Sequence, residues 1–298
     1  MRMGDWKIKL KPLISMILVL MVNQAVWSAE PPAGNTDEGD RGLASGKKFA
    51  LLVGIDDYDP YRQSPDDNTV SEDDLKGCVN DVTDIRKLLT DKRYAFRNDD
   101  EHIKVLTNRD ATRDAIIQTF RSHLIENAKK HPDGIFVFHY SGHGATGVPD
   151  YSGEEQDNSD ECIVSSDRDA ILDDELAGLC KELVDQTNSK ANVTLIFDCC
   201  HSGTMSRNVS GDRVRQLPAE RLALEKIKKR EQAKPRQGKG SEFEGQLVPE
   251  SDRYVSISAC ASTQEEPETG GERPNGVLTR NLTDLLKDAP RWWTYRYL

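Results

Sequence analysis

Apolar strands alternate with amphipathic helices along most of this 298-residue chain. Residues 48–55 (KFALLVGI) form a continuous apolar run, which is typical of a strand buried on both faces of a parallel sheet. Repeated alternation of this kind predicts an α/β fold with a mostly parallel central sheet and helices on both faces. Further strands are predicted at residues 102–106, 134–140, 193–197 and 254–259, helices at 79–89, 112–128, 173–184 and 278–286, and a long acidic loop before the third of these helices.

Residues 1–28 have the pattern of a secretory signal peptide. Four basic residues precede an apolar run at 13–22, which is shorter than the about 20 residues that a membrane-spanning helix needs. We therefore expect cleavage after Ser28 or Ala29, export to the periplasm or the medium, and no stable membrane insertion. The next residues, 29–46, are polar and rich in Pro, Gly and acid, as in a disordered spacer.

The remaining chain divides into a domain at 47–290 and a tail at 291–298 that lacks a stop signal and suggests truncation there. A basic insertion at 204–249 interrupts the domain, although the whole chain has a formal net charge of −11. Because proteases cut exposed polar loops, we predict that this linker is exposed, flexible and processed by the chain itself. The alternative is a solvated loop whose basic residues pair with the acidic body. The candidate cleavage residues are Arg207, Arg213, Arg215, Arg221 and the run 228–230.

The acidic balance of the chain argues against a nucleic-acid partner, since phosphate binding needs a basic face. The six cysteines are too few to frame a domain of this size with disulfides. We therefore expect Cys78, Cys162 and Cys180 to be buried free thiols.

Two polar clusters directly follow predicted strands. They are 139–144 (HYSGHG) and 198–203 (DCCHSG), and ligands of parallel sheets bind at the carboxyl ends of the strands. A neighbouring imidazole activates a thiol, and backbone N–H groups beside Gly144 and Cys200 can stabilise an oxyanion. The clusters therefore predict a cysteine nucleophile with a histidine base.

The same histidines and cysteines invite a zinc interpretation, because two histidines four residues apart can share a metal on a helix. Here His139 and His143 lie on a strand that runs into glycines, so their rings would not converge. We favour His139 as a core residue.

Together, the two clusters resemble the caspase and metacaspase family of cysteine peptidases, over about residues 47–286. Metacaspases carry the base in a YSGHG turn and the nucleophile directly before His-Ser-Gly. The resemblance therefore implies a caspase-like fold with His143 as base and Cys200, not Cys199, as nucleophile. The glutamine-alanine-cysteine signature of animal caspases is absent.

The resemblance also implies a first specificity pocket lined by Asp81, Ser141 and Asp198. Carboxylates in such a pocket attract a guanidinium or ammonium group, which predicts cleavage after Arg or Lys. Cleavage after Asp is disfavoured because it needs basic residues in the pocket. For Asp81 alone, a helix-capping role is the alternative.

An acidic calcium site is a further implication of the resemblance, with Asp160, Asp173 and Asp174 as ligands. The fourth expected carboxylate is missing, since residues 206–208 are Ser, Arg and Asn. A helix-start role for Asp173 and Asp174 stays open. The chemistry itself requires no cofactor, so calcium would act only as a regulator.

The combined prediction is a monomeric cysteine endopeptidase that acts on proteins or peptides through a Cys-His dyad and an acyl-enzyme. The alternative is a catalytically silent caspase-fold scaffold that binds basic partners. Intact His143 and Cys200 argue against the scaffold.

Overall fold

The computed structural model describes residues 47–58, 71–151, 159–200, 214–233, 247–248, 251–259 and 268–288. The predicted leader, spacer and tail lie outside these ranges, as does part of the insertion. Among the described residues, no helix is both long and apolar enough to cross a membrane.

In the part of the chain that the structure describes, five parallel strands form the central sheet in the order β2-β1-β3-β7-β8. The apolar runs of β1, β3 and β7 are buried, as their sequences predict. Ser141 at the end of β3 pairs with Asp198 at the end of β7, so the two polar clusters leave the sheet side by side. The bounds are β1 Lys48–Gly54, β2 Ile103–Thr107, β3 Ile135–Ser141, β7 Asn192–Asp198 and β8 Val255–Ser258.

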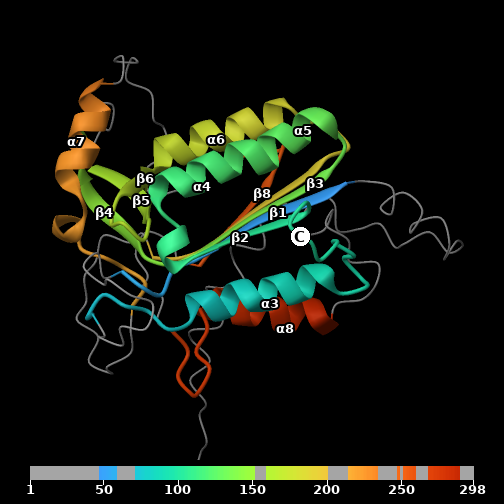
Figure 1. The fold of residues 1–298 in the computed structure, drawn as a ribbon, viewed down its shortest axis with the longest axis horizontal. Helices are drawn as coiled ribbons and strands as arrows, with labels where there is room; N and C mark the ends of the chain where they lie inside the picture. Colours follow the sequence, from blue (N-terminus) through green and yellow to red (C-terminus); the bar gives the residue numbers. More distant parts are fainter. Residues whose placement is uncertain are drawn as a thin grey trace, which may run out of the picture. The chain divides into compact units, whose positions relative to one another are not determined.

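Helices cover both faces of this sheet (Figure 1). The pair α3 (Cys78–Thr90) and α8 (Val277–Asp288) lies on one face. On the other lie α6 (Asp173–Asp185) and a longer helical segment. That segment consists of α4 (Arg113–Thr119), a π-helical turn (Phe120–Ile125) and α5 (Glu126–Lys130). The predicted α/β fold is confirmed.

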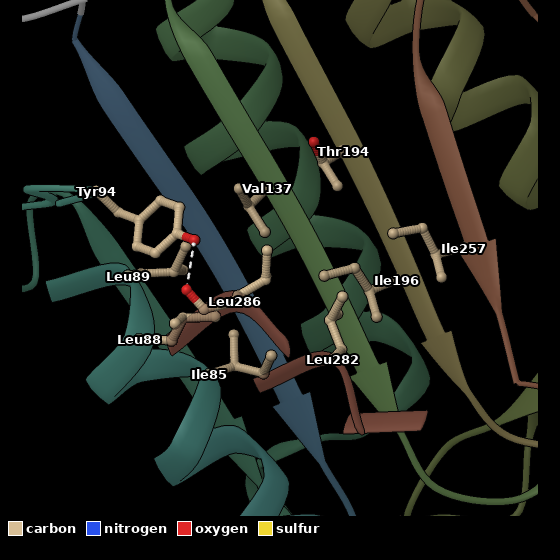
Figure 2. A pocket seen from close by; sticks show the side chains of 10 residues that line it. All are labelled: Ile85, Leu88, Leu89, Tyr94, Val137, Thr194, Ile196, Ile257, Leu282 and Leu286. Carbon is tan, nitrogen blue, oxygen red and sulfur yellow. Dashed lines mark hydrogen bonds between the residues drawn. The ribbon is translucent and has the colours of Figure 1, made fainter. Parts of the chain in front are cut away.

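Apolar side chains fill the space between the sheet and the α3–α8 pair (Figure 2). Val137 and Ile196 project from β3 and β7 toward Leu282 of α8. The Tyr94 hydroxyl donates to the Leu286 carbonyl at 3.3 Å. This packing fixes α8 against the sheet, and the residues at its start line the site described below.

The predicted acidic loop contains a second, antiparallel sheet. Its strands are β4 (Gly144–Pro149), β5 (Ser159–Val164) and β6 (Ala170–Leu172). The loop prediction is wrong because these strands are short and interrupted by glycine and acidic residues, so they lack a continuous apolar run. As β4 begins at Gly144, this sheet directly follows the first polar cluster.

The longer described part of the insertion, residues 214–233, packs against the domain. Leu217, Leu222 and Ile227 are buried, the last of them on α7 (Leu224–Ala233). Arg215 is completely buried. The prediction of an exposed, flexible linker is therefore wrong for this segment, because spaced apolar side chains anchor it in the core.

Five cysteines fall among the described residues and all are buried; Cys78, Cys162 and Cys180 are free thiols. Burial raises the pKa of the Cys180 thiol to about 12 and raises that of Cys162 further. The expectation for Cys78, Cys162 and Cys180 is confirmed, whereas Cys260 lies outside the described residues.

Candidate active site

The predicted base and nucleophile follow neighbouring strands, at the same edge of the sheet. His143 lies two residues beyond β3, and Cys200 lies two residues beyond β7, the neighbouring strand. Neighbouring parallel strands end at the same edge, so the order of the strands brings these residues together. Both side chains are buried.

The imidazole of His143 is held from two sides. The ring Nε2 donates to the backbone carbonyl of Asp73 at 2.8 Å. The backbone N–H of His143 donates to the Tyr58 hydroxyl, also at 2.8 Å. The Tyr58 ring lies 4.6 Å from the imidazole, centroid to centroid. Since Nε2 carries the proton, Nδ1 has the lone pair, and Nδ1 is buried without a hydrogen-bond partner among the described residues. Burial lowers the pKa of His143 to about 4, so the ring is neutral at pH 7 and able to accept a proton.

The predicted specificity pocket contains a side chain of the chain itself, that of Arg215. Its guanidinium donates to Asp81 through Nη2 and to Asp198 through Nη1, each at 2.7 Å. Nη1 also donates to the Ser141 hydroxyl at 2.8 Å. The structure therefore brings the three predicted pocket residues together around one guanidinium, and all four side chains are fully buried.

The backbone of Arg215 is bound as well. Its carbonyl oxygen accepts hydrogen bonds from the N–H groups of Gly144 at 3.0 Å and Cys200 at 3.1 Å. Two residues further along the chain, the N–H of Leu217 donates to the Gly144 carbonyl at 2.9 Å. A Cβ at Gly144 would overlap the Cys200 carbonyl, so this close approach requires glycine. The carbonyl of the Arg215–Gln216 peptide bond is thus held by two backbone N–H donors, one from each polar cluster.

Sequence reasoning missed Glu268, which adds a third carboxylate to the pocket. Its Oε1 lies 3.5 Å from Nη2 of Arg215 and accepts from the Gly77 N–H at 2.6 Å. Glu268 belongs to an acidic stretch in which nothing in the local sequence distinguishes it from its neighbours. Three carboxylates around one guanidinium leave a net negative charge, which suits a pocket for cations.

Glu268 forms an antiparallel bridge with Gly276, and the end of this short hairpin supports the pocket carboxylates. Asn275 donates to Asp81 at 2.9 Å, and the N–H of Gly276 donates to the same carboxylate at 3.1 Å. The N–H of Thr279, at the start of α8, donates to Asp198 at 2.7 Å. Burial raises the pKa of Asp81 to about 6, with Asp198 adding to the rise and Arg215 opposing it. The Gly270-Gly271 pair, with Gly271 at a positive φ, is the turn signal that the sequence offers between Glu268 and Gly276.

A methyl group at Gly276 should close the pocket. A Cβ there would overlap the Asp198 carboxylate and the Arg215 guanidinium. Since overpacking costs about 1–3 kcal/mol, we expect Gly276→Ala to raise KM for arginine reporter peptides roughly 5- to 150-fold. Gly270→Ala, on the same hairpin with open space around it, is the matched control. Equal KM values for the two variants would show that Gly276 does not line the pocket.

The predicted calcium ligands are near one another but do not form a compact set. Burial raises the pKa of Asp173 to about 8, and the charges of Asp160 and Asp174 add to the rise. Asp173 also accepts from the Asp174 N–H at 3.0 Å, in the first turn of α6. Among the described residues, these three do not meet a 4.8 Å spacing of ligand atoms. The donor chemistry suits calcium, but the spacing in this state does not.

One acidic group does have that spacing: Asp56, Cys78 and Glu268. Its carboxylates already accept backbone N–H groups at the start of α3, from Gly77 and Cys78. This group therefore caps a helix.

His139 lies away from His143 and contacts other residues. Its Nε2 lies 3.2 Å from the Thr279 hydroxyl, and the ring is fully buried. The Nε2 atoms of the two imidazoles contact different partners, the Thr279 hydroxyl for His139 and the Asp73 carbonyl for His143.

Acidification should destabilise the folded protein because His139 is buried in its neutral form. Burial lowers its pKa to about 4 from 6.5. Between these values the unfolded chain binds more protons, so the contribution to stability is present above pH 6.5 and is lost as the pH falls toward 4. The test compares two proteins that both carry Cys200→Ala, one with His139 and one with His139→Gln. When the pH falls from 7.5 to 5, we expect the free energy of unfolding to decrease by about 2 kcal/mol more in the protein with His139. Urea unfolding measures this, and identical pH dependence would contradict it.

A family model described as "Metacaspase, peptidase C14 domain" matches residues 47–208, more than half of the chain. The chain belongs to the metacaspase family. The matched region contains both polar clusters and strands β1, β3 and β7. The resemblance inferred from the motifs is thereby confirmed.

Metacaspase relatives from plants and fungi are similar to this chain. Metacaspase-7 of Arabidopsis thaliana is 39% identical over 159 residues, covering 52% of this chain and 35% of that protein. Metacaspase-1 of Meyerozyma guilliermondii is 33% identical over 189 residues, covering 60% and 41%. The chain therefore spans less than half the length of these relatives.

A crystal structure of a Geobacter sulfurreducens protein has a similar fold. It superposes with a TM-score of 0.55 at 25% identity, covering 81% of this chain and 82% of that one. This similarity supports the caspase-like arrangement of the metacaspase domain.

Proposed function

We propose that this metacaspase is a cysteine endopeptidase that cleaves after arginine and lysine, and that it first cleaves its own Arg215–Gln216 bond. One observation carries the proposal: the side chain of Arg215 fills the acidic pocket while its carbonyl accepts the N–H groups of Gly144 and Cys200. The described conformation therefore resembles a substrate complex formed within one chain.

The geometry supports a mechanism through an acyl-enzyme. His143 Nδ1 removes the proton of the Cys200 thiol, and the sulfur attacks the Arg215 carbonyl carbon. The N–H groups of Gly144 and Cys200 stabilise the oxyanion, and they already donate to the oxygen on which that charge develops. The His143 imidazolium then protonates the departing amine of Gln216, and water hydrolyses the thioester.

The backbone carbonyl of Asp73 is proposed to orient the base. It keeps Nε2 protonated and leaves Nδ1 to face the reaction. The Asp73 side chain is itself paired with Arg168 at 2.9 Å, which fixes the loop that carries this carbonyl.

Short reporter peptides that end in Arg, Lys or Asp test the specificity. We expect the processed protein to release the reporter from the Arg and Lys peptides and not from the Asp peptide, because the pocket carries three carboxylates. Preference for the Asp peptide would contradict the proposal. The silent scaffold predicts no self-cleavage and no release from any peptide, and it also predicts that a thiol alkylator labels Cys200 no faster than the other cysteines.

Calcium is proposed as a regulator that brings Asp160, Asp173 and Asp174 together. We expect millimolar calcium to stimulate self-cleavage, because a cation relieves the repulsion that raises the pKa of Asp173. Asp173→Ala should remove the stimulation. Full activity in chelator, with no effect of Asp173→Ala, would remove calcium from the account.

Export is proposed from the leader at residues 1–28. The mature protein would then act as a monomer in the periplasm or the medium. Sequencing of the recovered amino terminus tests this, since export predicts a start at residue 29 or 30.

A further inference from the structure

The segment after the Arg215–Gln216 bond is anchored independently of that bond. Leu217, Leu222 and Ile227 are buried in the larger apolar core, and the N–H of Leu217 donates to the Gly144 carbonyl. All of these contacts belong to residues on the carboxyl side of the bond. Cleavage therefore breaks none of them.

Two arginines of this segment add ion pairs to the body of the domain. Arg221 pairs with Asp73 and, at 2.6 Å, with Glu72. Arg230, on α7, pairs with Asp169 at 3.0 Å. Arg215 itself becomes the end of the other fragment, so hydrolysis frees it to exchange with an incoming arginine while the segment 216–233 stays in place.

We propose that the Gln216 amine created by self-cleavage stays at the site and accepts acyl groups from Cys200, so that the processed protein joins peptides ending in arginine to its own Gln216. The proposal rests on the proposed function, because the amine exists only after cleavage at Arg215. It adds an acyl-transfer activity to the hydrolytic one.

The step is the reverse of acylation. The neutral amine nitrogen of Gln216 attacks the carbonyl carbon of the thioester between Cys200 and the arginine peptide, and the N–H groups of Gly144 and Cys200 hold the oxyanion. The N–C bond forms and the C–S bond breaks. The amine proton passes to His143 Nδ1 and then to the Cys200 sulfur, which restores a neutral imidazole and a thiol. The arginine peptide ester supplies the acyl group, so no oxidant or reductant is needed.

The position of the amine gives it an advantage over water. After cleavage the Gln216 amine remains beside the position of the former peptide bond, because the N–H of the next residue, Leu217, donates to the Gly144 carbonyl. A reactant fixed in attack geometry acts at a high effective molarity. Because an α-amino group has a pKa of about 8, the neutral amine fraction rises with pH, and the ratio of joining to hydrolysis should rise with it.

Self-processed full-length protein and an acetylated peptide methyl ester ending in arginine test the proposal. We expect the fragment that begins at Gln216 to gain the mass of the acyl peptide, increasingly so between about pH 6.5 and 8.5. Leu217→Ala loosens the chain beside the amine and should lower the ratio of joined to hydrolysed product about tenfold or more, while ester hydrolysis continues. Leu222→Ala is a second variant with the same expectation if Leu217→Ala fails to fold or to process. Lys228→Ala removes an exposed side chain of α7 and should leave the ratio unchanged.

The outcomes separate this proposal from the proposed function. Ester hydrolysis without any mass gain would overturn the joining activity and leave the peptidase standing. A gain located on lysine side chains, or one unaffected by the leucine variants, would also overturn it, since the acceptor would not be a held amine. A wild type that never cuts at Arg215 would instead overturn the proposed function, and the joining activity with it.

Discussion

Replacement of Cys200 by alanine is expected to slow self-cleavage by roughly 10⁴-fold or more, because no acyl-enzyme can form without the thiol. Cys199→Ala is the matched control, and it should keep most of the activity. Cys199 belongs to the apolar core, whereas the N–H of Cys200 contacts the Arg215 carbonyl. Intact mass spectrometry over time measures both rates, and equal loss in the two variants would contradict the assignment.

The same comparison applies to the two histidines. His143→Ala should lose self-cleavage as completely as Cys200→Ala, because His143 is the proposed acceptor of the thiol proton. His139→Ala should act mainly through stability, since its ring contacts Thr279 in the core. Thermal unfolding measured beside the cleavage rate separates these two effects.

Removal of one pocket carboxylate is expected to have the next largest effect. Asp198→Asn leaves the arginine of a substrate with an incomplete set of buried partners, which costs about 2–5 kcal/mol. This corresponds to a fall in kcat/KM for arginine peptides of roughly 30- to 5,000-fold. Asp81→Asn should behave alike, because each carboxylate lies 2.7 Å from a guanidinium nitrogen.

Asp185→Asn is the control for this experiment. Asp185 is an exposed acid on α6 whose partner is Lys181, so its removal changes the net charge equally without touching the pocket. We expect it to retain wild-type kcat/KM. Unchanged arginine cleavage by Asp198→Asn and Asp81→Asn would refute the pocket.

The central sheet could be predicted from the sequence because its strands are continuous apolar runs. Burial on both faces demands such runs in β1, β3 and β7, and few other structures tolerate them. The second sheet could not be predicted in this way. Its strands begin at Gly144 and include acidic residues such as Asp160, so their pairing depends on neighbours that periodicity does not show.

The reactive residues could be predicted from the sequence where they belong to a short local motif. The clusters around His143 and Cys200 each follow a strand, so sequence order alone brings them to one edge. Arg215 is one of several arginines in the insertion, and only the folded structure shows that this one enters the acidic pocket. Glu268 likewise reaches the pocket through a contact with Gly77, about 190 positions away, a separation that local sequence cannot reveal.

The most direct test of the account is to identify the new amino terminus formed when purified wild-type protein is incubated. We predict a fragment that begins at Gln216 and that is absent when Cys200→Ala or Arg215→Gln is incubated in the same way. Arg213→Gln, two positions earlier, should be cut like the wild type. A terminus elsewhere, such as after the basic run at 228–230, or a Gln216 terminus formed equally well by Cys200→Ala, would contradict the claim that the chain holds its own Arg215 as a substrate.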